Sequence, residues 1–310
     1  MKQPVNPTMS SFESRRNEVR RRGHAAKMRR KPLSVRLMSL LALCLPGDRL
    51  KTHFYLNVID RPRKLLRTYV QSFYRIDHIY QVLRFARQNL DDRFSILEFG
   101  TANGYAFTKM LYATEYLGLS DRVVCHAFDT FDGMPEVEDT RDHDLIAGHH
   151  WQEGQFAGDY EALDAFCQAH YCNYQLHKGA FEETLTPEFL ESLRTDKPLL
   201  IWIDCDYYSS TRAALVPLLP YLPNGCVIYF DDFELLNYGS RFTGEARFVH
   251  ELNRGDYGDD LEFVLDKQLS LDTSRCYRFI RFRSGVQYKQ RGAGLSGNTA
   301  RMRTNDSPLP

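Results

Sequence analysis

The stretch ILEFGTANGYAF, Ile96–Phe107, joins an apolar, strand-like run to a helix-like run through a turn with two glycines. Glu98 lies near the end of the strand-like run, and Gly100 and Gly104 bracket the turn. Gly100 has no Cβ, so the backbone there can approach a ligand closely. In open α/β sheets, ligands bind beyond the carboxyl ends of the strands, against the start of the next helix. The stretch predicts such a site, although tight strand-to-helix turns also use glycine for structural reasons alone.

Strand-like and helix-like runs alternate outward from this stretch. Central runs such as PLLIWIDCD are apolar throughout, which is typical of parallel strands covered by helices on both faces. No helical pattern separates the last two strand-like runs, which indicates an antiparallel hairpin at one edge. We therefore predict an α/β fold, a doubly wound, mostly parallel seven-stranded sheet with an antiparallel C-terminal hairpin and an N-terminal helical extension. The predicted strands are 94–100, 122–129, 174–179, 198–206, 225–233, 261–268 and 276–282, and the helices 104–118, 160–171, 186–194, 209–222 and 244–253.

The 310 residues divide into four predicted parts. Residues 1–31 are basic and poor in aromatic residues, so we expect a disordered tail. Residues 32–89 form a helical accessory segment, 90–286 the main α/β domain, and 287–310 a second disordered tail rich in Gly, Ser and Arg. In the accessory segment, the apolar residues at helical spacing are Ile76, Ile79, Tyr80, Leu83 and Phe85.

Acidic and basic residues balance at 40 each, but Arg and Lys concentrate in the first 36 residues. The apolar run Leu37–Leu45 that follows is shorter than the ~20 residues of a transmembrane helix, and no signal-cleavage pattern comes after it. We expect a cytoplasmic protein. Three interpretations of the basic N-terminal segment stay open: a solvated tail, a segment that contacts an anionic inner membrane surface, or an arm that binds nucleic acid. The last is least supported, because aromatic residues do not interleave with the basic ones.

Seven cysteines are scattered without a C-x-x-C pair. This dispersal argues against a disulfide framework and against a zinc site, and it favours a reducing compartment. Cys125 and Cys226 lie inside apolar runs, so we expect them to be small core residues.

Two further segments follow predicted strands and reach the same rim as the glycine turn. HAFDTFDGMPE ends the second strand with Asp129, about 30 residues beyond Glu98. A carboxylate there can accept hydrogen bonds from ribose hydroxyls, and a turn-capping role is the alternative. HKGAF follows the third strand, where Gly179, Ala180 and Phe181 are placed to hold an adenine ring.

These motifs together resemble the class I S-adenosylmethionine (SAM)-dependent methyltransferases, and more closely the macrocin O-methyltransferase (TylF-like) family, which methylates sugar hydroxyls. The resemblance covers roughly residues 94–282 and rests on LEFGTANG, FDTFDGMPE, WQEGQF, HKGAFEETL, WIDCDYYSST, YFDDF and GEARFVHEL. The antiparallel ending of the sheet is also typical of methyltransferases. The resemblance implies a SAM site made by Glu98, Gly100, Thr101 and Gly104, with Asp129 and Thr130 at the ribose.

The family also implies a divalent cation, usually Mg²⁺, held by an aspartate after the fourth strand and two adjacent acids after the fifth. Here these are Asp204 or Asp206, with Asp231 and Asp232. Cys205 stands where the family has glycine, which leaves open which of the first two aspartates points inward. Carboxylates suit Mg²⁺, and a cation beside the acceptor stabilises a developing alkoxide. The alternative is that one acid caps an element while another faces solvent.

The general base stays open at this point. His149 and His150 lie in a long loop between Pro135 and Tyr160, and loops longer than ~15 residues are often functional lids. Histidine accepts a proton near neutral pH, and Asp204 or Asp206 are the alternatives. In the same loop, Trp151 and Phe156 stack on an acceptor or pack the lid.

The sequence thus predicts a SAM- and Mg²⁺-dependent O-methyltransferase acting on a sugar or related small molecule, in a chain that can form homo-oligomers. Three alternatives belong to other classes. A nicotinamide-dependent oxidoreductase would need the third glycine of a phosphate-binding turn, which is missing. A non-catalytic binding protein would not need the acids that all remain at the expected positions. An RNA methyltransferase would be recruited by the basic arm.

Overall fold

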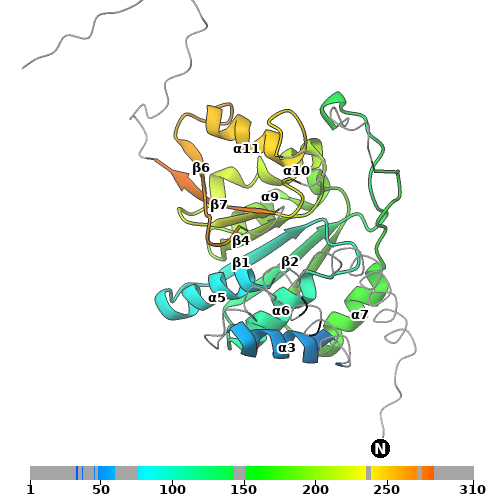
Figure 1. Ribbon diagram of the computed structural model, residues 1–310, viewed down its shortest axis with the longest axis vertical. Coiled ribbons are helices and arrows are strands. Elements are labelled where there is room, and N and C mark those ends of the chain that lie inside the picture. The colour runs from blue at the N-terminus through cyan, green and yellow to red at the C-terminus, as the bar shows by residue number, and fades with distance from the viewer. Residues whose placement is uncertain are drawn as a thin grey trace, which may run out of the picture.

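The computed structural model describes residues 33, 37, 45, 48–59, 76–142, 151–234, 239–270 and 274–282. The predicted tails, 1–31 and 287–310, lie outside these residues. The described strands are β1 (Phe94–Phe99), β2 (Val123–Asp129), β3 (Tyr174–Lys178), β4 (Lys197–Ile203), β5 (Val227–Phe230), β6 (Leu261–Leu265) and β7 (Arg275–Arg281). They form a seven-stranded sheet in the order β3-β2-β1-β4-β5-β7-β6 (Figure 1).

The sheet confirms the predicted fold class. β1 lies near its centre and pairs in parallel with β2 and β4, and β4 pairs in parallel with β5. β7 runs antiparallel between β5 and β6, so the closing hairpin occupies one edge. The strand order reverses between β1 and β4, which makes the carboxyl ends of these two strands the switch point where ligands bind in such sheets.

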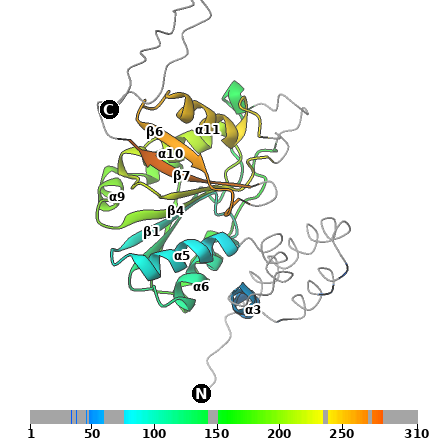
Figure 2. The same ribbon diagram turned by 60° about the vertical axis from the view of Figure 1, so that its left-hand side comes forward.

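Helices cover both faces of the sheet, as Figures 1 and 2 show. One face packs against α3, α5, α6 and α7 through a core that includes Trp202 and Tyr229. The other packs against α10 and α11 through a core that includes Phe99 and Phe230. The bounds are α3 (Asp48–Ile59), α5 (Asp77–Asn89), α6 (Phe107–Tyr116), α7 (Tyr160–His170), α8 (Phe181–Thr184), α9 (Pro187–Ser192), α10 (Tyr208–Leu215) and α11 (Gly244–Arg254).

The helix predicted over 209–222 is shorter in the structure. α10 ends at Leu215, and a separate 3₁₀ turn spans Leu219–Tyr221. Pro217 and Pro220 explain the break, because proline lacks the amide hydrogen that an α-helix needs and clashes with the preceding turn.

α9 lies within the helix predicted over 186–194. Thr186 caps it by accepting a hydrogen bond from the Phe189 amide at 3.2 Å, and Pro187 occupies its first turn.

The prediction of the apolar face of α5 is wrong at one residue, Phe85. Phe85 is 55% exposed, whereas Val82 and Ala86 are buried beside Leu83. A step of 100° per residue places residue 85 off the stripe that Ile79 begins.

Cys125 and Cys226 are buried, as predicted. None of the helices within the described ranges is long and apolar enough to cross a membrane.

Candidate active site

The carboxyl ends of three neighbouring strands are held level by backbone hydrogen bonds. The amide of Gly100 donates to Phe128 O at 3.0 Å, and the amide of Asp204 donates to Phe99 O at 2.9 Å. On the other side of β4, the amide of Asp231 donates to Ile203 O at 3.0 Å. The first residues beyond β1, β4 and β5 therefore lie on one rim, at the switch point of the sheet.

The two glycines of the first turn have structural reasons of their own. Gly100 has a φ of +87°, and a Cβ there would lie 1.9 Å from the carbonyl oxygen of Asp204. Gly104 has a φ of +66°, and its Cβ would lie 2.4 Å from a methyl group of Leu163 on α7. The fold itself therefore requires glycine at both positions, as the structural interpretation of this turn predicted. This requirement is compatible with a ligand contact by the same turn.

Asp129 joins the loops that follow β1 and β2. Its Oδ2 accepts a hydrogen bond from the Ala102 amide at 2.7 Å, and its Oδ1 accepts one from the Phe131 amide at 2.6 Å. Burial raises the pKa of this carboxyl, and the amides of Ala102, Phe131 and Thr101 act in the opposite direction. The turn-forming role considered for Asp129 is thus present, on the side where the ribose of SAM is expected.

The other cofactor candidates share this rim. Glu98 and Thr101 are buried beside the first turn. Thr130 accepts a hydrogen bond from the Asp132 amide at 3.2 Å. The backbone of Gly179 donates to Asp129 O at 3.0 Å, which ties the end of β3 to that of β2. Ala180 precedes α8, which Phe181 begins with its ring edge-on to Phe99 at 5.2 Å.

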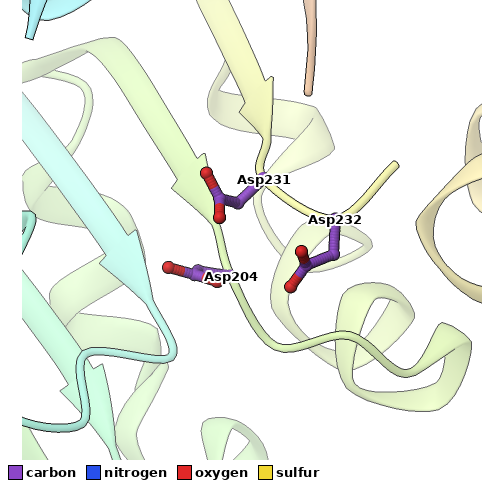
Figure 3. Close-up of side chains that lie close together, drawn as sticks. All are labelled: Asp204, Asp231 and Asp232. Atoms are coloured by element: carbon purple, nitrogen blue, oxygen red, sulfur yellow. The ribbon is translucent and has the colours of Figure 1, made fainter. Parts of the chain in front are cut away.

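Three aspartates converge beyond β4 and β5 (Figure 3). One carboxylate oxygen from each of Asp204, Asp231 and Asp232 lies within 4.8 Å of the others. Their grouping places Asp204, not Asp206, with the pair after β5. The hydroxyl of Tyr229 donates to Asp231 Oδ1 at 2.7 Å and so fixes one of these carboxylates. Hard carboxylate oxygens that converge from two strands fit a divalent cation such as Mg²⁺.

Asp206 lies beside this group and has a different environment. Its φ of +59° is uncommon for a residue with a side chain. Its carboxyl hydrogen-bonds to the Asp232 side chain and to the indole of Trp151. Burial is the main reason that the pKa of Asp206 is raised, and the charge of Asp231 adds to it. The pKa of Asp232 is raised well above its usual value, by burial first and then by the charge of Asp206.

One acidic residue of this region was missed by the sequence analysis. Glu245, in the first turn of α11, is only 2% exposed. Burial raises its pKa far above the ordinary range, and the charges of Asp206, Asp204 and Asp231 raise it further. GEARFVHEL was interpreted as a helix and as one of the motifs of the family resemblance, with no role for Glu245. A first-turn acid at that point is also the ordinary way to stabilise a helix start, so no local signal marked Glu245 as part of the acidic group.

The described parts of the long loop pack around the aspartates. Asp142 accepts a hydrogen bond from the Ser209 amide at 3.1 Å, at the start of α10. The Tyr207 hydroxyl donates to the Trp151 carbonyl oxygen at 3.4 Å. The rings of Trp151 and Phe156 meet edge to face at 5.2 Å.

The candidate bases His149 and His150 lie outside the described residues. Of the groups considered as bases, Asp204 and Asp206 are therefore the two that the structure places at the rim.

Residues 97–233 match the sequence profile of a family described as "Methyltransferase domain". Among solved structures, the O-methyltransferase NovP is 18% identical, with a TM-score of 0.53 over 76% of this chain and 100% of NovP. The calicheamicin methyltransferase CalS11 is 21% identical, with a TM-score of 0.50 over 76% of this chain and 93% of CalS11. At these identities the likeness shows a shared fold. No curated protein matches the sequence.

Proposed function

We propose that this chain, which carries a class I SAM-dependent methyltransferase domain, methylates a hydroxyl of a sugar or related polyhydroxylated small molecule with the help of a divalent cation, Mg²⁺ foremost. The observation that carries the proposal is the convergence of Asp204, Asp231 and Asp232 at the switch point of the sheet, one strand away from the glycine turn. A cation at the cofactor rim would stabilise the negative charge that develops on a weakly acidic hydroxyl acceptor.

In this proposal, the loops after β1, β2 and β3 bind SAM. The turn between Gly100 and Gly104 faces the amino-acid end of SAM, at the start of α6. Asp129 keeps acceptor capacity for a ribose hydroxyl beyond the amides of Ala102, Phe131 and Thr101. Phe181, at the start of α8, supports the adenine ring together with Gly179 and Ala180. Each of these roles is an assignment to be tested by substitution.

Asp204, Asp231 and Asp232 would hold the cation, which when bound lowers the cost of negative charge on the acceptor oxygen. The transfer is an in-line displacement, in which the acceptor oxygen forms a bond to the methyl carbon as the bond from sulfur to that carbon breaks. S-adenosylhomocysteine leaves, and the hydroxyl proton passes to a base. The residues of the rim supply positioning, because the reacting atoms must be held close and aligned.

We assign the base to Asp206. It lies next to the three aspartates but outside their mutual grouping, and its carboxyl contacts the side chains of Asp232 and Trp151. The Trp151 indole holds it in place, and Trp151 belongs to the loop expected to cover the acceptor. A carboxylate whose pKa is raised is also the better proton acceptor. His149 and His150 remain alternatives for this role.

The decisive experiment is a calorimetric titration of SAM into the purified protein, with Mg²⁺ and then with a chelator. We expect micromolar SAM binding in both conditions. We then expect release of S-adenosylhomocysteine from a panel of glycosides and nucleotide sugars only when Mg²⁺ is present. Absence of SAM binding in both conditions would contradict the proposal, and turnover that survives chelation would remove the cation from it.

Three variants separate the roles in the same assay. Asp129→Ala should abolish SAM binding. Asp206→Asn should retain binding of SAM and of Mg²⁺ but lose turnover by about 100-fold or more, the usual contribution of a general base. The double substitution of His149 and His150 by alanine should leave turnover unchanged, and a loss there would move the role of base from Asp206 to the loop.

A further inference from the structure

Glu245 is a buried acid that no described neighbour neutralises. It is 2% exposed, and neither of its carboxylate oxygens makes a side-chain hydrogen bond within the described part of the chain. Among the largest influences on its pKa, only the backbone amide of Asp232 lowers it. A buried carboxylate without a cation or a set of donors is costly, so its retention at this position calls for a partner.

The surroundings of Glu245 indicate where that partner belongs. Besides burial, the charges of Asp206, Asp204 and Asp231 raise the pKa of Glu245. The backbone amide of Asp232, the last of the three converging aspartates, lowers it. Besides burial, the charge of Glu245 raises the pKa of the Cys205 thiol, and Cys205 lies between the two aspartates that follow β4. Glu245 is therefore buried on a third element, α11, within range of the charges of this acidic group, although its oxygens are not among those that lie within 4.8 Å of one another.

A helix-start role does not account for these observations. A first-turn acid stabilises a helix from the surface, where water solvates its charge, and Glu161 does so at the start of α7. Glu245 is instead enclosed. Thr243, the cap residue of α11 two positions before Glu245, is 3% exposed, and its hydroxyl has no hydrogen-bond partner among the described residues. The start of α11 thus carries two buried oxygen-bearing side chains that are left without the partners such groups normally have.

We propose that Glu245 is an additional oxygen ligand of the cation site, binding the ion directly or through a water on it. This inference rests on the proposed function, since it assumes that Asp204, Asp231 and Asp232 hold a divalent cation. With Glu245 the donor set comes from β4, β5 and α11. A cation then links the helix to the two strand ends and offsets the mutual repulsion of the acids.

The test is the affinity of the full chain for Mn²⁺ and Mg²⁺, measured by calorimetry, together with thermal unfolding with and without each ion. Glu245→Gln keeps the shape of the side chain and removes its charge. We expect this variant to bind the ions about 10- to 100-fold more weakly, the range seen when supporting groups of metal sites are lost. Without ions it should unfold at no lower temperature than the wild type, because the uncharged amide costs no more to bury than the carboxyl that it replaces. Its stabilisation by either ion should shrink accordingly.

Glu161→Gln is the matched control, because it removes an exposed first-turn glutamate from another helix. It should leave ion affinity unchanged. Glu245→Ala is a second variant, in case the buried amide of glutamine disturbs the fold.

Equal ion affinity in wild type and Glu245→Gln would overturn this inference alone. A loss of stability in both Glu245 variants that is equal with and without ions would also overturn it, since that is the pattern of a purely structural residue. Absence of ion binding in the wild type would overturn the cation part of the proposed function as well.

Discussion

The carbonyl oxygen of Asp204 lies where a side chain on Gly100 would begin. This contact joins the first turn of the expected SAM site to the first residue of the acidic group, because the two belong to neighbouring strands. Any group larger than hydrogen at residue 100 must push the two loops apart. One residue therefore sets the spacing between the two halves of the site.

We predict that Gly100→Ala destabilises the protein and weakens both SAM and Mg²⁺ binding. The left-handed φ alone costs about 1–2 kcal/mol for a residue with a Cβ, and the overlap with the Asp204 carbonyl adds to it. Chemical denaturation and calorimetry measure the two effects.

Gly225→Ala is the control for Gly100→Ala. Gly225 has the same φ of +87°, but a Cβ there would meet nothing within 4 Å. It should therefore show the conformational cost without loss of ligand binding. Equal effects of the two substitutions would mean that the contact with Asp204 is unimportant.

Tyr229 positions Asp231 from within the core. Its ring stacks on His78 of α5 at 4.3 Å, and its hydroxyl donates to Asp231 Oδ1. We predict that Tyr229→Phe keeps the stacked ring and costs only about 1 kcal/mol of stability, the usual value of one hydrogen bond. Because Asp231 loses its orientation, Mg²⁺ affinity should fall by about 10-fold or more.

The control for Tyr229→Phe is Tyr174→Phe. The hydroxyl of Tyr174 donates to Asp164 Oδ1 at 2.8 Å. The substitution therefore removes a similar hydrogen bond between a tyrosine and an aspartate, at the far edge of the sheet. It should lower stability by a similar amount and leave Mg²⁺ affinity unchanged. If both variants bind Mg²⁺ as the wild type does, the positioning role of Tyr229 is wrong.

Among the elements, β2 and β3 share a pair of histidines that the proposed reaction does not use. His126 Nδ1 and His177 Nε2 lie 3.1 Å apart, and His177 stacks on Phe128 at 4.2 Å. Burial lowers the pKa of His126 to about 3, and the charge of His177 contributes. Burial also lowers the pKa of His177 to about 4. Both rings are therefore neutral in the folded protein near neutral pH.

This pair should make stability depend on pH. In the unfolded chain a histidine has a pKa of about 6.5, so between about pH 6.5 and pH 4 the unfolded state binds more protons than the folded state. The free energy of unfolding should therefore fall as the pH falls through this window, by at most about 1.4 kcal/mol per pH unit for each histidine. Denaturation of the wild type and of His177→Phe at pH 7 and pH 4.5 measures the effect.

The raised pKa values of Asp206, Asp232 and Glu245 act in the opposite direction, since the folded state then keeps protons that the unfolded state releases. The histidine contribution is therefore the difference between wild type and His177→Phe, which should lose less stability on acidification. The exposed His170, substituted by glutamine, is the control and should behave as the wild type. An unchanged pH dependence in His177→Phe would contradict the assignment.

At the scale of the whole molecule, the sheet order places the candidate site. β2 and β3 extend to one side of β1, and β4 and β5 extend to the other, so the loops of the two halves diverge between β1 and β4. The expected SAM residues lie on the first half and the acids on the second. α11 returns across the second half and brings Glu245 to the acids, and the described ends of the long loop add Trp151.

Much of the fold could be predicted because its signals are local. A buried parallel strand needs an apolar side chain at nearly every position, so the runs at β1, β4 and β5 stand out along the chain. Helix ends were less certain. The break after Leu215 depends on prolines within an otherwise helical pattern, and the exposure of Phe85 depends on the exact phase of α5.

The sequence by itself determined the strands and helices, the closing hairpin, and the positions of the acids just beyond the strand ends, because each follows from neighbouring residues and their periodicity. Only the tertiary structure decided that Asp204 joins Asp231 and Asp232, that Asp206 lies beside them, and that Glu245 of α11 is buried within range of their charges. The physical reason is distance along the chain. Which side chains meet depends on strand order, register and helix docking, and these arise when segments far apart in sequence bury their apolar faces together.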